Sequence, residues 1–222
     1  MQIVIGNKNY SSWSMRPWVL AKEAGIPFEE VQLKFKEADG GLTVDGIERY
    51  GVAGKVPVLV IDGEPVWDSL AICETLAERF PEKQLWPADR SARQVARSIC
   101  AEMHSGFQAM RSSMPMNIRS VYPGKGIENS RSDIDRVIAI WASCREKFGT
   151  GGAMLFGRFS VADAYFAPVV MRFRTYSVDL PKGAQAYCDA VSGLRSVREW
   201  MDGARKETEF VPTDEPYASR NR

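Results

Sequence analysis

A run of hydroxyl-bearing residues near the N-terminus has the types and spacing to do chemistry. Residues 10–16 read YSSWSMR and follow a short apolar run. The first turn of a helix presents unpaired backbone N–H groups and the positive end of the helix dipole, so hydroxyls there can help to hold an anion or a thiolate. Simple capping of a helix explains one of Ser11, Ser12 and Ser14, but not all three beside two tryptophans.

Two further motifs in the first 80 residues suit a peptide-like ligand. The first is GKVP at residues 54–57, where a cis bond before the proline would turn the backbone of Val56 outward to pair with an extended ligand. The second is the pair Asp68 and Ser69 at the start of a helix. Ser69 could bind a carboxylate and Asp68 an ammonium, with a plain helix cap as the alternative.

His104 is the only histidine, and it lies in a helical stretch. A hydrolytic Ser–His–Asp triad would need it. Adjacent residues on a helix do not face each other, however, and the sequence has no GxSxG elbow. The histidine is therefore expected either at the surface, in the core or on the wall of a pocket.

Composition and charge narrow the classes of function. The chain has 222 residues, of which 45% are hydrophobic, and 29 basic against 28 acidic side chains leave a net charge of +1. This balance favours neither nucleic acid nor a membrane surface as a partner. No signal peptide or membrane-length apolar run is present, and four widely separated cysteines lack metal-ligand spacing. The sequence predicts a cytoplasmic protein with buried thiols and no metal.

The elements that must position these residues divide the chain near residue 81. In residues 1–80, apolar runs and turn signals predict a βαβ–ββα order, which is typical of a thioredoxin-like domain. The expected strands are 2–6, 28–33, 56–61 and 64–67, and the expected helices are 15–24 and 68–80. The glycine-rich segment 34–55 is expected to hold one short helix, near residues 46–50.

A linker over residues 81–90 leads into an all-helical domain over residues 91–207, where the apolar spacing is three and four. The expected helices are 91–111, about 131–148, about 161–173, 182–191 and 194–206. Capping boxes are predicted at Ser130–Asp133 and Ser160–Asp163. Residues 208–222 are predicted to be an extended or frayed polar tail. The fold class is thus α/β followed by all-α.

Taken together, SSWSMR, GKVP, DSLAI, a linker with LWP, and SVAD resemble the cytosolic glutathione S-transferase family over about residues 1–207. The SSxSxR spacing is most similar to serine-type members, particularly the zeta class and its bacterial relatives. The resemblance implies a dimeric enzyme of detoxification that transfers glutathione to a small electrophile. Trp13 departs from the zeta class, which commonly has cysteine there.

The resemblance also implies roles for individual residues. Ser11, or the adjacent Ser12, would donate a hydrogen bond to the sulfur of glutathione and favour its thiolate. Val56, with the neighbouring Lys55, would hold the cysteinyl part of glutathione. The γ-glutamyl end would lie against Asp68 and Ser69.

The second substrate is expected between the domains, against the long helix that follows the linker. Candidates for its pocket are Met103, His104, Phe107 and Arg111. Met103 and Phe107 suit an apolar electrophile, whereas His104 and Arg111 suit an acidic one.

Other functions on the same fold remain as alternatives. One is a glutathione-dependent isomerase of small acids. Another is a binding or scaffold protein without turnover, because the family more often has Glu or Gln where Asp68 stands. A thiol oxidoreductase would need a cysteine at the start of the first helix, where the sequence has Trp13 and serines.

Overall fold

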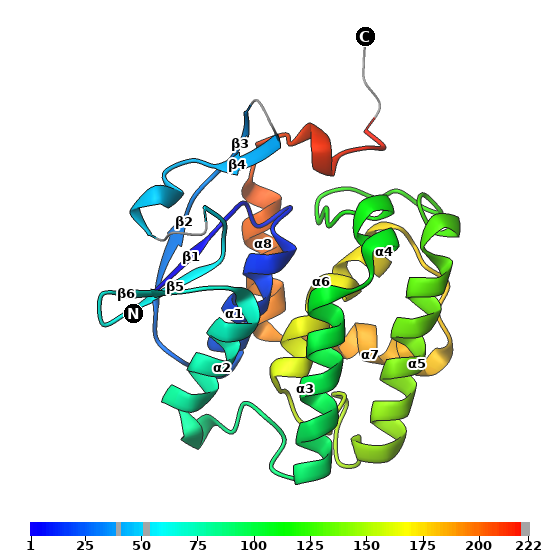
Figure 1. Ribbon diagram of the computed structural model, residues 1–222. Helices are drawn as coiled ribbons and strands as arrows, with labels where there is room; N and C mark the ends of the chain where they lie inside the picture. The colour runs from blue at the N-terminus through cyan, green and yellow to red at the C-terminus, as the bar shows by residue number, and fades with distance from the viewer. Residues whose placement is uncertain (39–40, 51–53, 219–222) are drawn as a thin grey trace.

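The computed structural model describes residues 1–38, 41–50 and 54–218, and its N-terminal part is a mixed sheet with helices (Figure 1). The sheet order is β2-β1-β5-β6, in which β1 pairs parallel with β2 and antiparallel with β5. This is the predicted thioredoxin-like arrangement, and the predicted fold class is confirmed. The elements are β1 (Gln2–Ile5), α1 (Ser12–Glu23), β2 (Glu29–Gln32), β5 (Val58–Ile61), β6 (Glu64–Val66) and α2 (Ser69–Arg79).

The segment between β2 and β5 holds a hairpin that the sequence pattern does not predict. β3 (Phe35–Ala38) and β4 (Gly41–Val44) pair antiparallel, with Phe35 opposite Val44. Each strand has only four residues, too few to show the sustained apolar alternation on which strand prediction depends. The expected short helix is present as η1 (Ile47–Arg49). Residues 39–40 and 51–53 of this segment lie outside the described residues.

The second half is helical, as predicted, but the long helix expected over residues 91–111 is divided in two. α3 ends at Ser105 and is capped by Gly106, Phe107 has a φ of +62°, and α4 then begins. The side chain of Arg111 donates to the carbonyl oxygens of Met103 and Gly106 (2.9 Å for the latter). A cation is favoured at the negative end of a helix dipole, so Arg111 stabilises the end of α3 there. The helices are α3 (Arg90–Ser105), α4 (Gln108–Ser113), α5 (Arg131–Phe148), α6 (Val161–Thr175), α7 (Lys182–Gly193) and α8 (Arg195–Lys206).

One of the two predicted capping boxes is present. At the start of α6, the Asp163 carboxylate accepts from the backbone N–H of Ser160 at 2.9 Å, and both bonds of the box are made. The prediction of a capping box at Ser130–Asp133 is wrong. The backbone N–H of Ser130 is already bonded to Ile127 in the 3-10 turn η3 (Glu128–Ser130). Asp133 accepts instead from the backbone N–H of Met110 at 2.9 Å.

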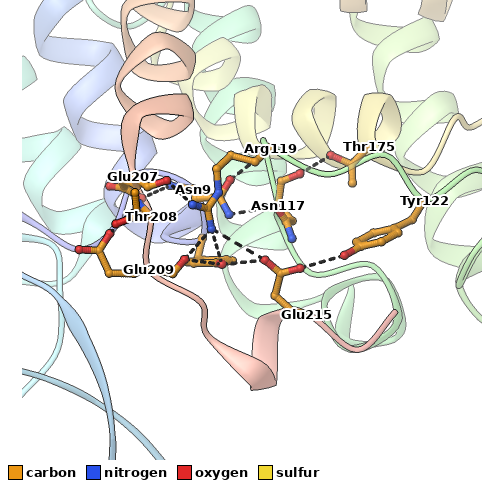
Figure 2. Close-up of polar contacts among 10 residues, drawn as sticks. Asn9, Asn117, Arg119, Tyr122, Thr175, Glu207, Thr208, Glu209 and Glu215 are labelled. Atoms are coloured by element: carbon orange, nitrogen blue, oxygen red, sulfur yellow. Dashed lines mark hydrogen bonds and ion pairs between the residues drawn. The ribbon is translucent and has the colours of Figure 1, made fainter. Parts of the chain in front are cut away.

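The C-terminal tail is ordered over its described part, residues 208–218, so the prediction of fraying is wrong there. It contains the short helix η4 (Pro212–Asp214), and Val211 is buried. The Glu215 carboxylate accepts from the hydroxyl of Tyr10. It also accepts from the hydroxyl of Tyr122 (Figure 2). A polar tail frays only when its polar groups lack partners, and these contacts supply them. Residues 219–222 lie outside the described part of the chain.

A single hydrophobic core connects the two halves. α1 lies between the sheet and the helices α6 and α8 (Figure 1). The buried cluster runs from Trp18 on α1 to Trp141 on α5 and Trp200 on α8. All four cysteines are buried, as predicted. In the part of the chain that the structure describes, no helix is both long enough and apolar enough to span a bilayer.

Candidate active site

The serines at the start of α1 make different contacts. Ser11 is the N-cap: its Oγ accepts weakly from the backbone N–H of Ser14 at 3.4 Å and donates to Ser14 Oγ at 2.7 Å. Ser12 Oγ accepts from the guanidinium of Arg172 on α6 at 3.3 Å. Both hydroxyls line a cavity of about 330 Å³, which we call the second cavity. Ser11 therefore stabilises the helix, and Ser12 links the serines to a buried cation.

A neighbouring first cavity, of about 430 Å³, brings together the residues expected at a peptide-like ligand. Lys55, Val56, Asp68, Ser69 and His104 all line it. The Val56–Pro57 peptide bond is cis, as the resemblance implied. Asp68 caps α2, and the Ser69 side chain is buried at the first position of that helix. The two cavities are adjacent, since Trp13, Lys55 and Val56 line both.

A chain of hydrogen bonds ties the first cavity to the helical half. Asp68 Oδ2 lies 3.0 Å from His104 Nε2, and His104 Nδ1 lies 3.2 Å from the hydroxyl of Tyr165. That hydroxyl is in turn 3.0 Å from Ser69 Oγ. His104 therefore lines a pocket, which decides among the three positions left open by the sequence. Its partners are a carboxylate and a phenol rather than a serine nucleophile.

Of the four residues predicted for the second substrate, Arg111 lines the second cavity and His104 the first. The prediction that Met103 and Phe107 line this pocket is corrected, because both are buried in the hydrophobic core and line neither cavity. The prediction assumed one continuous helix. Met103 lies on the face of α3 that enters the core, and Phe107 lies at the break between α3 and α4. Helical spacing therefore does not place these two residues on one face with Arg111.

Three guanidiniums near α1 lack a carboxylate partner among the described residues. Arg16 and Arg172 are buried, and among the described residues no carboxylate oxygen lies within 4 Å of Arg16, Arg111 or Arg172. Burial lowers the pKa of Arg16 to about 10 and of Arg172 to about 9, and the neighbouring positive charge of Arg111 adds to both shifts. Burial also lowers the pKa of Arg111. Buried cations without counter-charge favour an anionic ligand.

Trp13 occupies the centre of this arrangement. The guanidinium carbons of Arg16 and Arg111 lie 4.2 and 4.6 Å from its ring centroid, and the His104 ring meets it edge-on at 5.2 Å. Cation–π contacts of this kind hold guanidiniums in place without neutralising their charge. Trp13 thus orders the cationic groups at the boundary between the two cavities.

The known proteins that the chain resembles agree with this architecture. A family model described as "Glutathione S-transferase, N-terminal domain" matches residues 10–79, and one for the C-terminal domain matches residues 125–203. The chain belongs to the glutathione S-transferase family. A mouse maleylacetoacetate isomerase is 31% identical over 172 residues, which are 76% of each chain.

Solved structures share the fold of this glutathione S-transferase at lower identity. A glutathione transferase homolog from Burkholderia, with bound glutathione, has a TM-score of 0.69 at 22% identity and covers 93% of this chain and 98% of its own. A bacterial zeta-class maleyl pyruvate isomerase has a TM-score of 0.64 at 21% identity, covering 94% and 100%. The predicted family and its zeta-like character are confirmed.

Sequence reasoning missed two charged residues of this transferase's second cavity, Arg172 and Asp214. Arg172 left a signal, because an arginine within the otherwise apolar run of α6 must find a buried polar environment. The sequence has no comparable signal for Asp214, since the composition of a polar C-terminal segment does not indicate whether the segment packs against the protein.

Proposed function

We propose that this glutathione S-transferase binds glutathione in the first cavity and directs its thiolate at a small acidic electrophile in the second. The observation that carries the proposal is the set of guanidiniums without carboxylate partners beside Ser12. A site built to hold two anions, a thiolate and a substrate carboxylate, accounts for them. The glutathione bound to the Burkholderia homolog and the isomerase relatives support the same assignment.

Glutathione would lie extended across the first cavity. The outward backbone of Val56 pairs with its cysteinyl part, and Lys55 lies beside that contact. Ser69 and the N-terminus of α2 receive the γ-glutamyl carboxylate, and Asp68 receives the ammonium. The contact of Asp68 with His104 holds the shorter acidic side chain in place. This contact supports the proposed role of Asp68, whose side chain is one methylene shorter than the Glu or Gln more usual in the family.

The thiol would reach the boundary between the two cavities, near the start of α1. There a serine hydroxyl donates to the sulfur, while Arg172 and the N-terminus of α1 stabilise the negative charge. A free thiol has a pKa near 8.5 and is mostly protonated at neutral pH. These donors therefore supply the thiolate, which is the nucleophile.

Replacing each serine by alanine is expected to distinguish capping of α1 from activation of the glutathione thiol. Ser12→Ala should lower kcat/KM for an aromatic halide about ten- to a hundredfold, the effect of losing a hydrogen bond of roughly 1.5–3 kcal/mol to a charged group. Ser11→Ala should also destabilise the fold by about 1 kcal/mol, because Ser11 caps α1. Steady-state kinetics together with urea unfolding of each variant measure both effects.

The double variant tests whether either hydroxyl activates the sulfur. Full activity of Ser11→Ala/Ser12→Ala would rule out serine activation altogether. A loss confined to Ser11→Ala, beyond its effect on stability, would assign the donor to Ser11 instead. Ser98→Ala is the control, since Ser98 bonds only to the α3 carbonyl of Gln94 and lies away from both cavities.

A second reaction, glutathione-dependent isomerisation of a small unsaturated acid, is favoured by the maleylacetoacetate isomerase relatives. The thiolate would add to one carbon of a conjugated double bond and push the electron pair onto the carbonyl oxygen. After rotation, the pair returns, the C–S bond breaks and glutathione leaves unchanged. Product analysis distinguishes the reactions, since conjugation consumes glutathione and isomerisation does not.

A scaffold role without turnover predicts that bound glutathione keeps an ordinary thiol pKa. Ultraviolet titration of the bound thiol distinguishes this role from that of an enzyme. The enzyme should show a bound thiol pKa below 8.5, because the serine, the helix dipole and Arg172 favour the thiolate.

We also propose that the protein is a homodimer that works in the cytoplasm, as is typical of the family. One chain has a mass of 24.8 kDa. Light scattering should therefore give a mass of about twice that value at micromolar concentration. A mass that stays at one chain across the concentration range would contradict the dimer.

A further inference from the structure

The C-terminal segment, residues 207–218, is fastened to both halves of the molecule. In the N-terminal half, the Glu207 carboxylate accepts from the backbone N–H groups of Lys8 at 2.6 Å and Asn9 at 3.0 Å. In the helical half, Arg119 donates to the carbonyl oxygen of Glu207 (Figure 2). The segment therefore begins from a fixed point between the two halves.

A second anchor holds its far end. The Glu215 carboxylate is buried and accepts from the Tyr10 hydroxyl at 2.7 Å and the Tyr122 hydroxyl at 2.8 Å. The Tyr217 hydroxyl donates to the carbonyl of Ser113, at the end of α4, at 2.8 Å. Tyr10 directly precedes the serines of α1, so this anchor holds the segment against the candidate site.

Between the anchors, Asp214 lines the second cavity together with Ser12, Arg111 and Arg172. Lys55 is a third cation on this wall, and Asp214 is the one carboxylate among the described residues that line it. Asp214 is not within salt-bridge distance of a cation in the described chain. Its negative charge therefore lowers the electrostatic potential of the cavity and is not neutralised by an ion pair.

We infer that Asp214 determines the charge preference of the second cavity, so that the site accepts neutral or singly charged electrophiles and disfavours doubly charged ones. The inference rests on the proposed function of this cavity. The cations that line the cavity, Arg111, Arg172 and Lys55, carry three positive charges, of which a bound thiolate and Asp214 balance two. One negative charge on the substrate balances the third, whereas a second negative charge meets no excess positive charge.

The ionisation of Asp214 makes this preference depend on pH. The pKa of its carboxyl is raised to about 6, mainly by burial; nearby Arg172 opposes the shift and Glu215 adds to it. The titratable groups that also face it across the cavity are Arg111, Lys55 and the Tyr10 hydroxyl. Above about pH 6 the carboxylate is charged and disfavours anions, whereas below that pH it is neutral and does not.

The test measures inhibition of aromatic halide turnover at saturating glutathione, with propionate as a singly charged probe and fumarate as a doubly charged one. In Asp214→Asn the inhibition constant of propionate should fall about tenfold, and that of fumarate should fall by more, as expected for a unit charge several ångströms away. Asp214→Glu keeps the charge and should behave as the native protein. Asp179→Asn removes an exposed carboxylate elsewhere and should also change neither constant.

Two outcomes would overturn the inference. One is unchanged inhibition constants in Asp214→Asn; the other is an equal fall for both probes. If Asp214→Asn does not fold, the inference is tested on the native protein at two pH values. Fumarate should inhibit it more strongly at pH 5.5, where Asp214 is neutral, than at pH 7.5, where Asp214 is charged. A native protein that binds glutathione but turns over no electrophile contradicts the proposed function instead. The dissociation constants of propionate and fumarate then replace their inhibition constants as the test of Asp214.

Discussion

Replacing Arg172 by methionine is expected to lower kcat/KM about a hundredfold while leaving the fold as stable as before, or more stable. Arg172 is buried on α6, and its guanidinium donates to Ser12 Oγ at 3.3 Å and to the carbonyl of Met114 at 2.8 Å. Removing one preorganised donor from a developing or bound anion costs about 10²- to 10³-fold in rate. Replacing this unpaired buried charge by an apolar side chain of similar size removes its desolvation cost, which offsets the loss of the donor to the Met114 carbonyl.

Opposite signs for activity and stability make this prediction specific. A residue that only supports the fold would lose stability and activity together, whereas a residue held in a costly state for function gains stability when it is replaced. The ultraviolet titration of bound glutathione adds an independent measurement. In Arg172→Met the pKa of the bound thiol should rise toward 8.5, because a positive charge near the sulfur is lost.

Arg174→Met provides the matched control. Arg174 lies two residues further along α6, and its side chain is exposed. The same chemical change there should leave kcat/KM and the thiol pKa within about twofold of native values. Equal losses in the two variants, or native activity in Arg172→Met, would show that the guanidinium of Arg172 does not serve the anion.

The contrast between Arg172 and the serine motif shows what the sequence could reveal about the site. Ser11 and Ser12 belong to a local signal, since a strand, a hydroxyl cluster and a helix follow one another within a few residues. The contact from Arg172 to Ser12 spans 160 positions. Local spacing cannot predict such a contact, although a charge within an apolar helix indicates that a buried partner must exist.

The features of the fold also differ in whether nearby or distant residues determine them. Periodicity predicts the order of strands and helices because each depends on nearby residues. The apolar spacing continues through the break at Gly106, because Phe107 and Met110 are both buried, so periodicity does not reveal the break. The ordered tail depends on Tyr10 and Tyr122, which are distant in sequence. Both corrections affect the second cavity. The electrophile pocket is therefore the part of the molecule that the sequence predicts least well.

The two capping boxes that look alike in sequence are expected to differ in their energies. Asp163→Ala should lower the free energy of unfolding by about 3–5 kcal/mol. The buried Asp163 carboxylate accepts from the backbone N–H groups of Leu155 and Ser160, at 3.0 and 2.9 Å, and from the hydroxyl of Tyr187 at 3.1 Å. Truncation leaves all these buried donors without a partner, which is costly at each one.

Asp133→Ala is the matched control, because Asp133 accepts from the backbone N–H of Met110 alone among these contacts. Its loss should cost about 1–2 kcal/mol. Urea unfolding at one protein concentration measures both variants under the same conditions. Equal losses would mean that the network around Asp163 contributes no more than a single hydrogen bond.

The pH dependence of the Asp163→Ala effect provides a further test, with a defined sign. Burial raises the pKa of the Asp163 carboxyl from 3.8 to about 6, against the opposing effect of its hydrogen bonds. A carboxyl whose pKa is higher in the folded state contributes most below its unfolded pKa, and that contribution is lost as the pH rises through about 6. The stability lost in Asp163→Ala should therefore be larger at pH 5 than at pH 7.5. The reverse order would mean that Asp163 is stabilised as a carboxylate, with its hydrogen bonds outweighing its burial.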